Sequence, residues 1–284
     1  MRINTNVSSL TAQEASTNTN NALKSSLEKL STGLKINKAA DDASGLAIAD
    51  KLRTQATSII QAVDNGNSAV SLLQIADKSM AEQSNILDTI KAKMIQANTN
   101  TTSTDGVASI KSDVRKLLEQ LNNIAEQTNY NGTALLQAST GSSGTGTMPG
   151  LTFQVGETAA DTITVGNIQS NTSGLGLTSI VNNVSAGATF TSYGATAQGL
   201  VDDAITKLNE FRSEIGSTQN QVESAVRNLM TQSTNVKAAE SVIRDVDYAK
   251  ESANFNKQNI IAQAGSYAIS QANNVQQNVL KLLQ

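Results

Sequence analysis

The chain has 284 residues, of which 38% are hydrophobic and 3% aromatic, and its 21 basic and 24 acidic side chains leave a formal charge of -3. This length allows a buried core, but the shortage of bulky aromatic residues favours long helices packed side by side over a thick mixed core. With no histidine and no cysteine, the chain lacks the commonest general base, thiol nucleophiles, disulfides and cysteine-based metal sites, and its slightly acidic balance argues against nucleic acid as a partner.

These absences exclude most familiar enzyme chemistry, so we expect a protein that is not an enzyme and holds no cofactor or metal. No run of 18 apolar residues occurs, which predicts no membrane insertion. The first residues, MRINTNVSSLTAQ, contain no apolar segment typical of a signal peptide. If the protein leaves the cytoplasm, we expect it to use another route.

The N-terminal stretch predicts a weak helix. Its apolar residues fall into two sets that are out of phase, with polar residues between them. The sets are Ile3, Val7 and Leu10, and then Leu23, Leu27, Leu30 and Leu34. Such a helix is marginal alone, so we expect it to become ordered by docking against other helices.

A cluster of acids, Asp41, Asp42 and Asp50, follows this stretch. Paired carboxylates can act as acid and base or bind Mg²⁺ or Ca²⁺, but the spacing of a Ca²⁺ loop is missing. Gly33 is a suitable C-terminal stop for the first helix, and Asp41, Asp42 or Ser44 can cap the next one. We therefore interpret the cluster as the connection between two helices, with a metal site and a catalytic site as the alternatives.

Residues 44–97 predict one long helix. Apolar and small residues recur at alternating steps of three and four from Ala49 through Leu73 to Met94, which is a heptad pattern. A continuous helix of this length would extend about 80 Å. No single compact domain of this size needs such a rod.

A polar break, ANTNTTSTDG, ends the long helix and a second amphipathic helix follows it. Its apolar set is Val107, Ile110, Val114, Leu117, Leu121 and Ile124. We expect this helix to fold back on the first. The sequence NYNG then predicts a turn, because Asn-Gly readily supplies positive φ.

The middle of the chain changes in composition, since 11 of the 18 glycines lie between Gly141 and Gly199. Two alternating runs, LTFQV and DTITV, are joined by a short link and predict a β-hairpin. From Gln169 to Ala197 the pattern is weak and predicts a loop that could hold one more short strand.

The last third returns to helical periodicity. One apolar face predicts a helix over residues 197–236. A further stripe reaches almost to the last residue, at Ile261, Ala264, Ala268, Ala272, Val275, Val279 and Leu282. Together the segments predict a mainly α protein with long, coiled-coil-like helices from both chain ends packed together and a small central β region, the hairpin.

Three long motifs resemble the two ends of bacterial flagellin, the filament subunit of the flagellum. They are MRINTNVSSLTAQ, LEKLSTGLKINKAADDASGLAIADKLRTQ and NIIAQAGSYAISQANNVQQNVLKLL. EQTNYNGTALL and LTFQVGETAADTITV are similar to the family as well, so the resemblance covers residues 1–168 and 197–284. It implies a structural subunit that polymerises into the flagellar filament for swimming, driven by ordering and burial of the terminal helices.

The resemblance also implies a division of the chain. Residues 1–43 and 241–284 would form inner-tube helices with their connections, and 44–137 and 197–240 the long helices around them. Residues 138–196 would be a short, surface-exposed variable region of β and loop structure.

The resemblance implies roles for individual residues. Inner-tube packing is expected of Ile3, Val7, Leu10, Leu27, Leu30, Leu34 and of the C-terminal stripe at Ile261, Ala264, Ala268, Ala272, Val275, Val279 and Leu282. The joint between inner tube and surrounding layer is expected at Asp41, Asp42, Ser44 and Gly45.

The partners implied are many copies of the same chain in a helical filament, the flagellar export apparatus, an export chaperone, and the cap and hook-junction proteins. The expected location is the extracellular flagellum, reached through the flagellar channel. Flagellins detected by the vertebrate innate receptor carry Arg, Leu and Glu where this chain has Thr89, Lys93 and Asp113, so we expect weak receptor activation. Two other interpretations are a hook-filament junction protein and a soluble helical adaptor or signalling rod.

Overall fold

The computed structural model describes residues 6–99, 101–137, 150–185 and 190–282. The chain forms two compact units. The terminal unit consists of residues 1–56 and 234–284, and the central unit of residues 57–233. None of the helices in the described ranges has a stretch long and apolar enough to cross a membrane.

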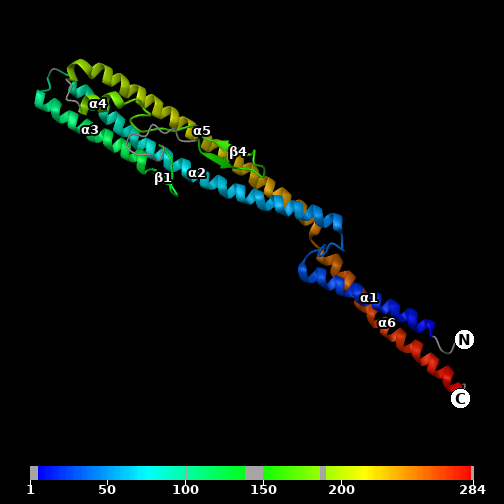
Figure 1. The fold of residues 1–284 in the computed structure, drawn as a ribbon. Coiled ribbons are helices and arrows are strands. Elements are labelled where there is room, and N and C mark those ends of the chain that lie inside the picture. The colour runs from blue at the N-terminus through cyan, green and yellow to red at the C-terminus, as the bar shows by residue number, and fades with distance from the viewer. Residues whose placement is uncertain (1–5, 100, 138–149, 186–189, 283–284) are drawn as a thin grey trace. The chain divides into compact units, whose positions relative to one another are not determined.

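In the terminal unit, α1 (Val7–Thr32) and α6 (Tyr248–Leu282) lie side by side (Figure 1). Side chains cap both helices at their N-termini, since the Asn6 carboxamide accepts from Ser9 N and the Asp247 carboxylate from Ala249 N. Helix α1 ends at Gly33, which has φ 74° and donates its N–H to the Lys29 carbonyl. The predicted glycine stop is therefore confirmed, because this left-handed conformation favours glycine.

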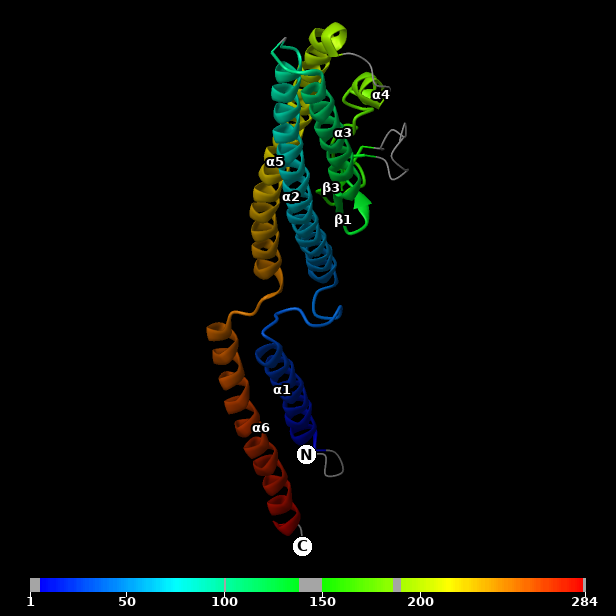
Figure 2. The ribbon, with the colours of Figure 1, turned by 90° about the vertical axis from the view of Figure 1, so that its left-hand side faces the viewer.

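The central unit is built on α3 (Thr104–Gln127) and on the larger parts of two long helices that pack with it, α2 (Ala43–Ala97) and α5 (Phe190–Arg244) (Figure 2). The start of α2 and the end of α5 belong to the terminal unit. The long helix predicted for residues 44–97 is confirmed as α2, and α3 folds back on it. Much of the predicted apolar stripes lies in one large buried cluster that includes Met80, Leu87, Val114, Leu121, Ala204 and Leu208. A smaller cluster holds Val222 of α5 together with Ile163. Helix α5 extends beyond the predicted limits of 197 and 236 at both ends.

Two β-hairpins accompany these helices; the second was predicted as a hairpin, and of the first only its turn was predicted. Strand β1 (Asn129–Tyr130) pairs with β2 (Thr133–Ala134) through a turn in which Asn131 and Gly132 have φ 50° and 82°. Strand β3 (Thr152–Gln154) pairs with β4 (Thr162–Thr164), with Phe153 opposite Ile163. The small central β region is therefore confirmed.

The prediction of a loop with at most one short strand between Gln169 and Ala197 is wrong for most of this stretch. Helix α4 (Thr178–Ser185) lies here and α5 begins at Phe190. Leu177 and Ile180 are buried in the main cluster, so tertiary packing of a few apolar residues stabilises a helix whose own pattern is weak. The rest of the predicted variable region, residues 138–149 and 186–189, lies outside the described residues.

Helices α2 and α5 approach each other closely at Gly66. A Cβ atom placed on Gly66 would lie 2.4 Å from Val226 Cγ2, closer than carbon atoms tolerate. Gly216 of α5 has no atom within 4 Å of the same position. Gly66 and Gly216 therefore differ, since only at Gly66 does a side chain of a neighbouring helix occupy the space that a Cβ atom would need.

Candidate assembly surface

Helices α1 and α6 meet along a seam of mostly small and polar side chains. The less exposed residues of both helices recur at alternating steps of three and four, as in a coiled coil. On α1 this row is Ser9, Ala12, Ser16, Thr19, Leu23, Ser26 and Leu30, and Ala22, Ser25, Glu28 and Lys29 beside it are half-buried as well. On α6 they are Glu251, Phe255, Gln258, Ala262, Gly265, Ile269 and Ala272.

Hydrogen bonds fix the antiparallel register of this seam. Ser26, only 3% exposed, donates its hydroxyl to Glu251 Oε1 at 2.5 Å. At the other end, Asn6 Nδ2 donates to the Ala272 carbonyl at 3.2 Å, and Ser9 Oγ to Asn273 Oδ1 at 2.9 Å. The first two pairs are partly buried, and such pairs specify one register, because a shifted register would leave them unpaired.

Several large apolar side chains of the two helices lie outside the seam, although Leu23, Leu30, Phe255 and Ile269 lie within it. Val7 is 60% exposed and Leu27 is 54% exposed on α1, while Ile260 is 67% and Tyr267 is 74% exposed on α6. In a single chain, therefore, several side chains whose burial would contribute strongly to stability remain exposed to water.

The structure places most of the predicted packing residues on these exposed faces. The exposed ones are Val7, Leu10, Leu27, Ile261, Ala264, Ala268 and Val275. Leu30, Leu34 and Ala272 are half-buried. Ile3 lies outside the described residues, as do the side chains of Val279 and Leu282.

Sequence reasoning missed Ile260 and Tyr267, because it followed one stripe through Ile261 and Ala268. The two missed residues are seven apart, which is the heptad spacing, so a second stripe could have been found from the sequence. It also missed Ser26 and Glu251, for which hydrophobic periodicity gives no signal.

The acidic cluster forms the connection between α1 and α2. Asp42 Oδ1 accepts from Gly45 N at 2.9 Å and caps α2, as predicted for one of the candidates. Asp41 Oδ2 accepts from Lys38 N at 3.0 Å and from Asn37 N at 3.1 Å. These two backbone donors, Lys38 first, lower the pKa of Asp41 from its usual value of 3.8.

The other predicted joint residues differ in their surroundings. Gly45 is buried, and a Cβ atom there would lie 2.7 Å from Ile36 Cδ1, so the joint has no space for a side chain at this position. Ser44 is exposed. Asp50 binds Arg53 at 3.0 Å and lies 3.8 Å from Arg244, so the three aspartates of the cluster have different partners.

The chain segments that leave α1 and enter α6 are joined by backbone hydrogen bonds. Leu34 and Asp245 form an antiparallel bridge. Lys35 N donates to the Arg244 carbonyl at 2.6 Å, and Val246 N donates to the Gly33 carbonyl at 3.0 Å. The two connections of the terminal unit therefore form one paired structure.

Two of the three receptor-equivalent positions form a contact within the central unit. Lys93 Nζ lies 3.0 Å from Asp113 Oδ2 in an ion pair between α2 and α3. Thr89, exposed and one turn before Lys93, donates its hydroxyl to the Asn85 carbonyl. The charges of Lys93 and Asp113 are therefore paired with each other within the chain.

Comparison with known proteins identifies the family. Residues 3–140 match the bacterial flagellin N-terminal helical region, and residues 199–283 match the bacterial flagellin C-terminal helical region. The flagellin of Bacillus subtilis (strain 168) is 34% identical over 304 residues, and the flagellar filament 33 kDa core protein of Treponema phagedenis is 33% identical over 286 residues. Each alignment covers 100% of both chains.

A solved structure described as a flagellar hook-associated protein from Vibrio parahaemolyticus has a TM-score of 0.61 at 11% identity, covering 72% of this chain and 99% of that one. This likeness shows the fold alone. The identity to flagellins along the full chain favours a filament subunit over a hook-filament junction protein or a soluble adaptor. The chain belongs to the bacterial flagellin family and is a structural subunit that polymerises into the extracellular flagellar filament.

Proposed function

We propose that the terminal unit supplies the contacts that build the filament, with α1 and α6 of each chain buried against other copies as an inner tube. The observation that carries this proposal is that the contact between the two helices is mostly small and polar, whereas several of their large apolar side chains are exposed. Small and polar residues such as Ser16 and Gly265 line their seam, while Leu10, Leu27 and Ile260 face water.

In a polymer, neighbouring copies can bury these exposed apolar side chains, and this burial stabilises the assembly. Full burial of one Leu or Ile side chain contributes about 1.5–3 kcal/mol, and each terminal unit exposes several such side chains. Because neighbouring copies bind only the ordered helices, polymerisation stabilises helices that are weak in one chain. The proposed packing residues include Ile3, which lies outside the described residues, and Val279 and Leu282, whose side chains do.

In the proposed division, residues 1–43 and 241–284 form the inner tube and its connections. Residues 44–137 and 197–240 form the surrounding layer, and residues 138–196 form the outer, variable region, of which Val165, Leu177 and Ile180 pack into the core of the central unit. Asp41, Asp42 and Gly45 set the geometry of the joint, because they hold its backbone by capping and close packing. We assign Ser44, which is exposed, to contacts with neighbouring subunits.

The further partners follow from membership in the family. We propose export through the flagellar channel by the flagellar export apparatus, with an export chaperone before export and cap and hook-junction proteins at the ends of the filament. The role is mechanical, and we propose no catalytic activity and no cofactor. We also propose weak activation of the innate receptor, since Lys93 and Asp113 pair with each other; a dose response in reporter cells equal to that of a strongly detected flagellin would contradict this.

The test is filament formation by a truncated chain. Deletion of residues 265–284 removes about half of α6, including Tyr267 and Val275. We expect electron microscopy to show filaments for the full chain at rising concentration and none for the truncated one. Circular dichroism should show that the central unit of the truncated chain remains helical. Filaments formed by the truncated chain would refute the role given to α6.

A further inference from the structure

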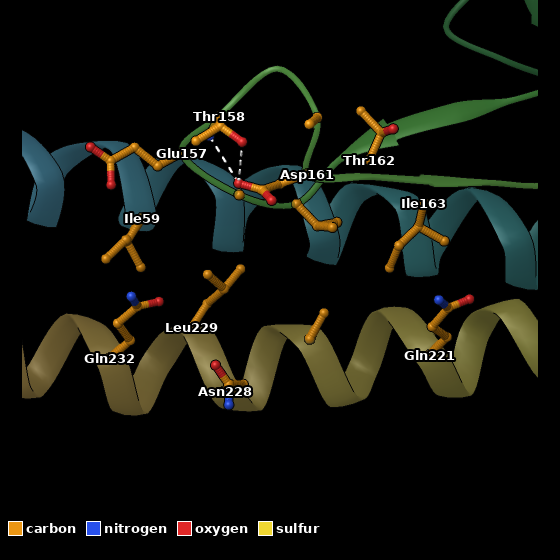
Figure 3. A pocket seen from close by; sticks show the side chains of 14 residues that line it. Ile59, Glu157, Thr158, Asp161, Thr162, Ile163, Gln221, Asn228, Leu229 and Gln232 are labelled. Atoms are coloured by element: carbon orange, nitrogen blue, oxygen red, sulfur yellow. Dashed lines mark hydrogen bonds between the residues drawn. The ribbon is translucent and has the colours of Figure 1, made fainter.

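A pocket of about 600 Å³ lies in the central unit, beneath the loop that joins β3 and β4 (Figure 3). Its floor is apolar, with Ile59 of α2 pointing towards α5 and Leu229 reaching up from α5. Both side chains are buried. The pocket is thus a preformed depression over the line where the two long helices meet.

The rim of the pocket is polar and negatively charged. Glu157 and Asp161 belong to the loop, and Gln221, Asn228 and Gln232 form a row of amides along α5. No lysine or arginine is present among the residues that line the pocket in the described part of the chain. The pocket therefore offers several hydrogen-bond acceptors and two carboxylates without a cation.

Hydrogen bonds hold the loop and the Asp161 carboxylate, while the Glu157 carboxylate is exposed at the rim. Asp161 Oδ2 accepts from Thr158 N at 3.0 Å and from the Thr158 hydroxyl at 2.8 Å. These bonds, the hydroxyl first, lower the pKa of Asp161, which keeps it ionised at neutral pH. Gln154 Nε2 also donates to the Gly156 carbonyl at 3.0 Å.

The central unit itself has lysines that would fit such a pocket. Lys78 of α2 and Lys116 of α3 are exposed and without an ion pair or hydrogen bond among the described residues. The other lysines and the arginines of the unit all have partners within the chain. A lysine side chain has an apolar stem that suits Ile59 and Leu229 and an ammonium group that suits Glu157.

We propose that this pocket is a contact site between subunits, in which a lysine of the central unit of a second copy inserts between the β3–β4 loop and α5. A second copy is the occupant because the chain polymerises, which brings identical central units together at high local concentration. The stem covers the apolar floor, and the ammonium pairs with Glu157 and hydrogen-bonds to the amide oxygens of α5. This inference rests on the filament function and adds a contact outside the terminal unit.

The first experiment measures the monomer concentration at which filaments form. Glu157→Gln keeps the size of the side chain and removes its charge, so we expect this concentration to rise about fivefold. Glu126→Gln, at an exposed acid of α3 that does not line the pocket, changes the net charge equally and should leave the concentration unchanged. Thermal unfolding of both monomers should match that of the unaltered chain, because Glu157 is exposed.

The second experiment identifies the lysine. A carbodiimide joins a carboxylate to an amine only where the two are in contact, so treated filaments should yield an intersubunit peptide linking Glu157 or Asp161 to Lys78 or Lys116. Treated monomers should not yield it. Lys→Gln at the linked position should then raise the concentration for filament formation as Glu157→Gln does.

The proposal is overturned if Glu157→Gln assembles like the unaltered chain, if Glu126→Gln has the same effect, or if filaments give no such linked peptide. In these cases filaments still form, so the function of the terminal unit is untouched. Failure of the full, unaltered chain to form filaments would overturn both.

Discussion

The two units of this flagellin place their apolar residues in opposite ways. In the central unit, large side chains such as Met80, Leu87 and Leu121 are fully buried between α2, α3 and α5. In the terminal unit, α1 and α6 meet mostly through small and polar residues, and Leu10, Leu27 and Tyr267 remain in water. The central unit is therefore built to be stable within one chain, and the terminal unit to gain stability from its neighbours.

The same substitution in each unit tests this comparison most strongly. Leu87→Ala removes a fully buried side chain and should lower the free energy of unfolding of the central unit by about 2–5 kcal/mol, measured by chemical denaturation of the monomer. Leu27→Ala, in the terminal unit, should leave that denaturation curve unchanged and raise the monomer concentration needed for filaments. Equal loss of monomer stability in both variants would contradict the comparison.

The two helical glycines test how closely the central unit is packed. Gly66→Ala places a Cβ atom against Val226 and should lower the free energy of unfolding by about 1–3 kcal/mol. Gly216→Ala meets no atom and should raise the free energy by roughly 0.5–1 kcal/mol, because alanine favours the helix. Thermal denaturation of the monomer measures both, and stabilisation by Gly66→Ala would show that α2 and α5 can move apart freely.

The smallest expected effect concerns the joint in the terminal unit. The depressed pKa of Asp41 means that its ionised form favours the folded joint at pH values above its usual pKa of 3.8. This contribution is lost as the pH falls through the lower pKa of the folded chain. We expect hydrogen exchange at the amides of Asn37 and Lys38, corrected for intrinsic rates, to show this loss of protection on acidification. Asp41→Asn should remove this pH dependence, and an unchanged pH profile in that variant would assign the effect to another group.

Much of the fold could be predicted from the sequence because its signals are local. The heptad steps through Ala49 and Met94 gave α2, and the Asn131-Gly132 pair marked the turn between β1 and β2. Helix α4 could not be predicted in this way, because it depends on Leu177 and Ile180 entering a core formed by distant segments. At the joint, the choice among Asp41, Asp42 and Ser44 as the cap of α2 depended on the backbone path between the helices.

By itself the sequence determined the long helices, the β3–β4 hairpin, the turn at Asn131-Gly132, the glycine stop at Gly33 and the family, since periodicity, turn residues and long motifs are properties of neighbouring residues. Only the tertiary structure decided which face of α6 meets α1. That seam is made mostly by Ser26, Glu251 and other small or polar residues, whose contribution is hydrogen bonding and close approach. A hydrophobic pattern identifies apolar helix faces. In the terminal unit these faces are exposed in the single chain, and we propose that other copies of the chain bury them.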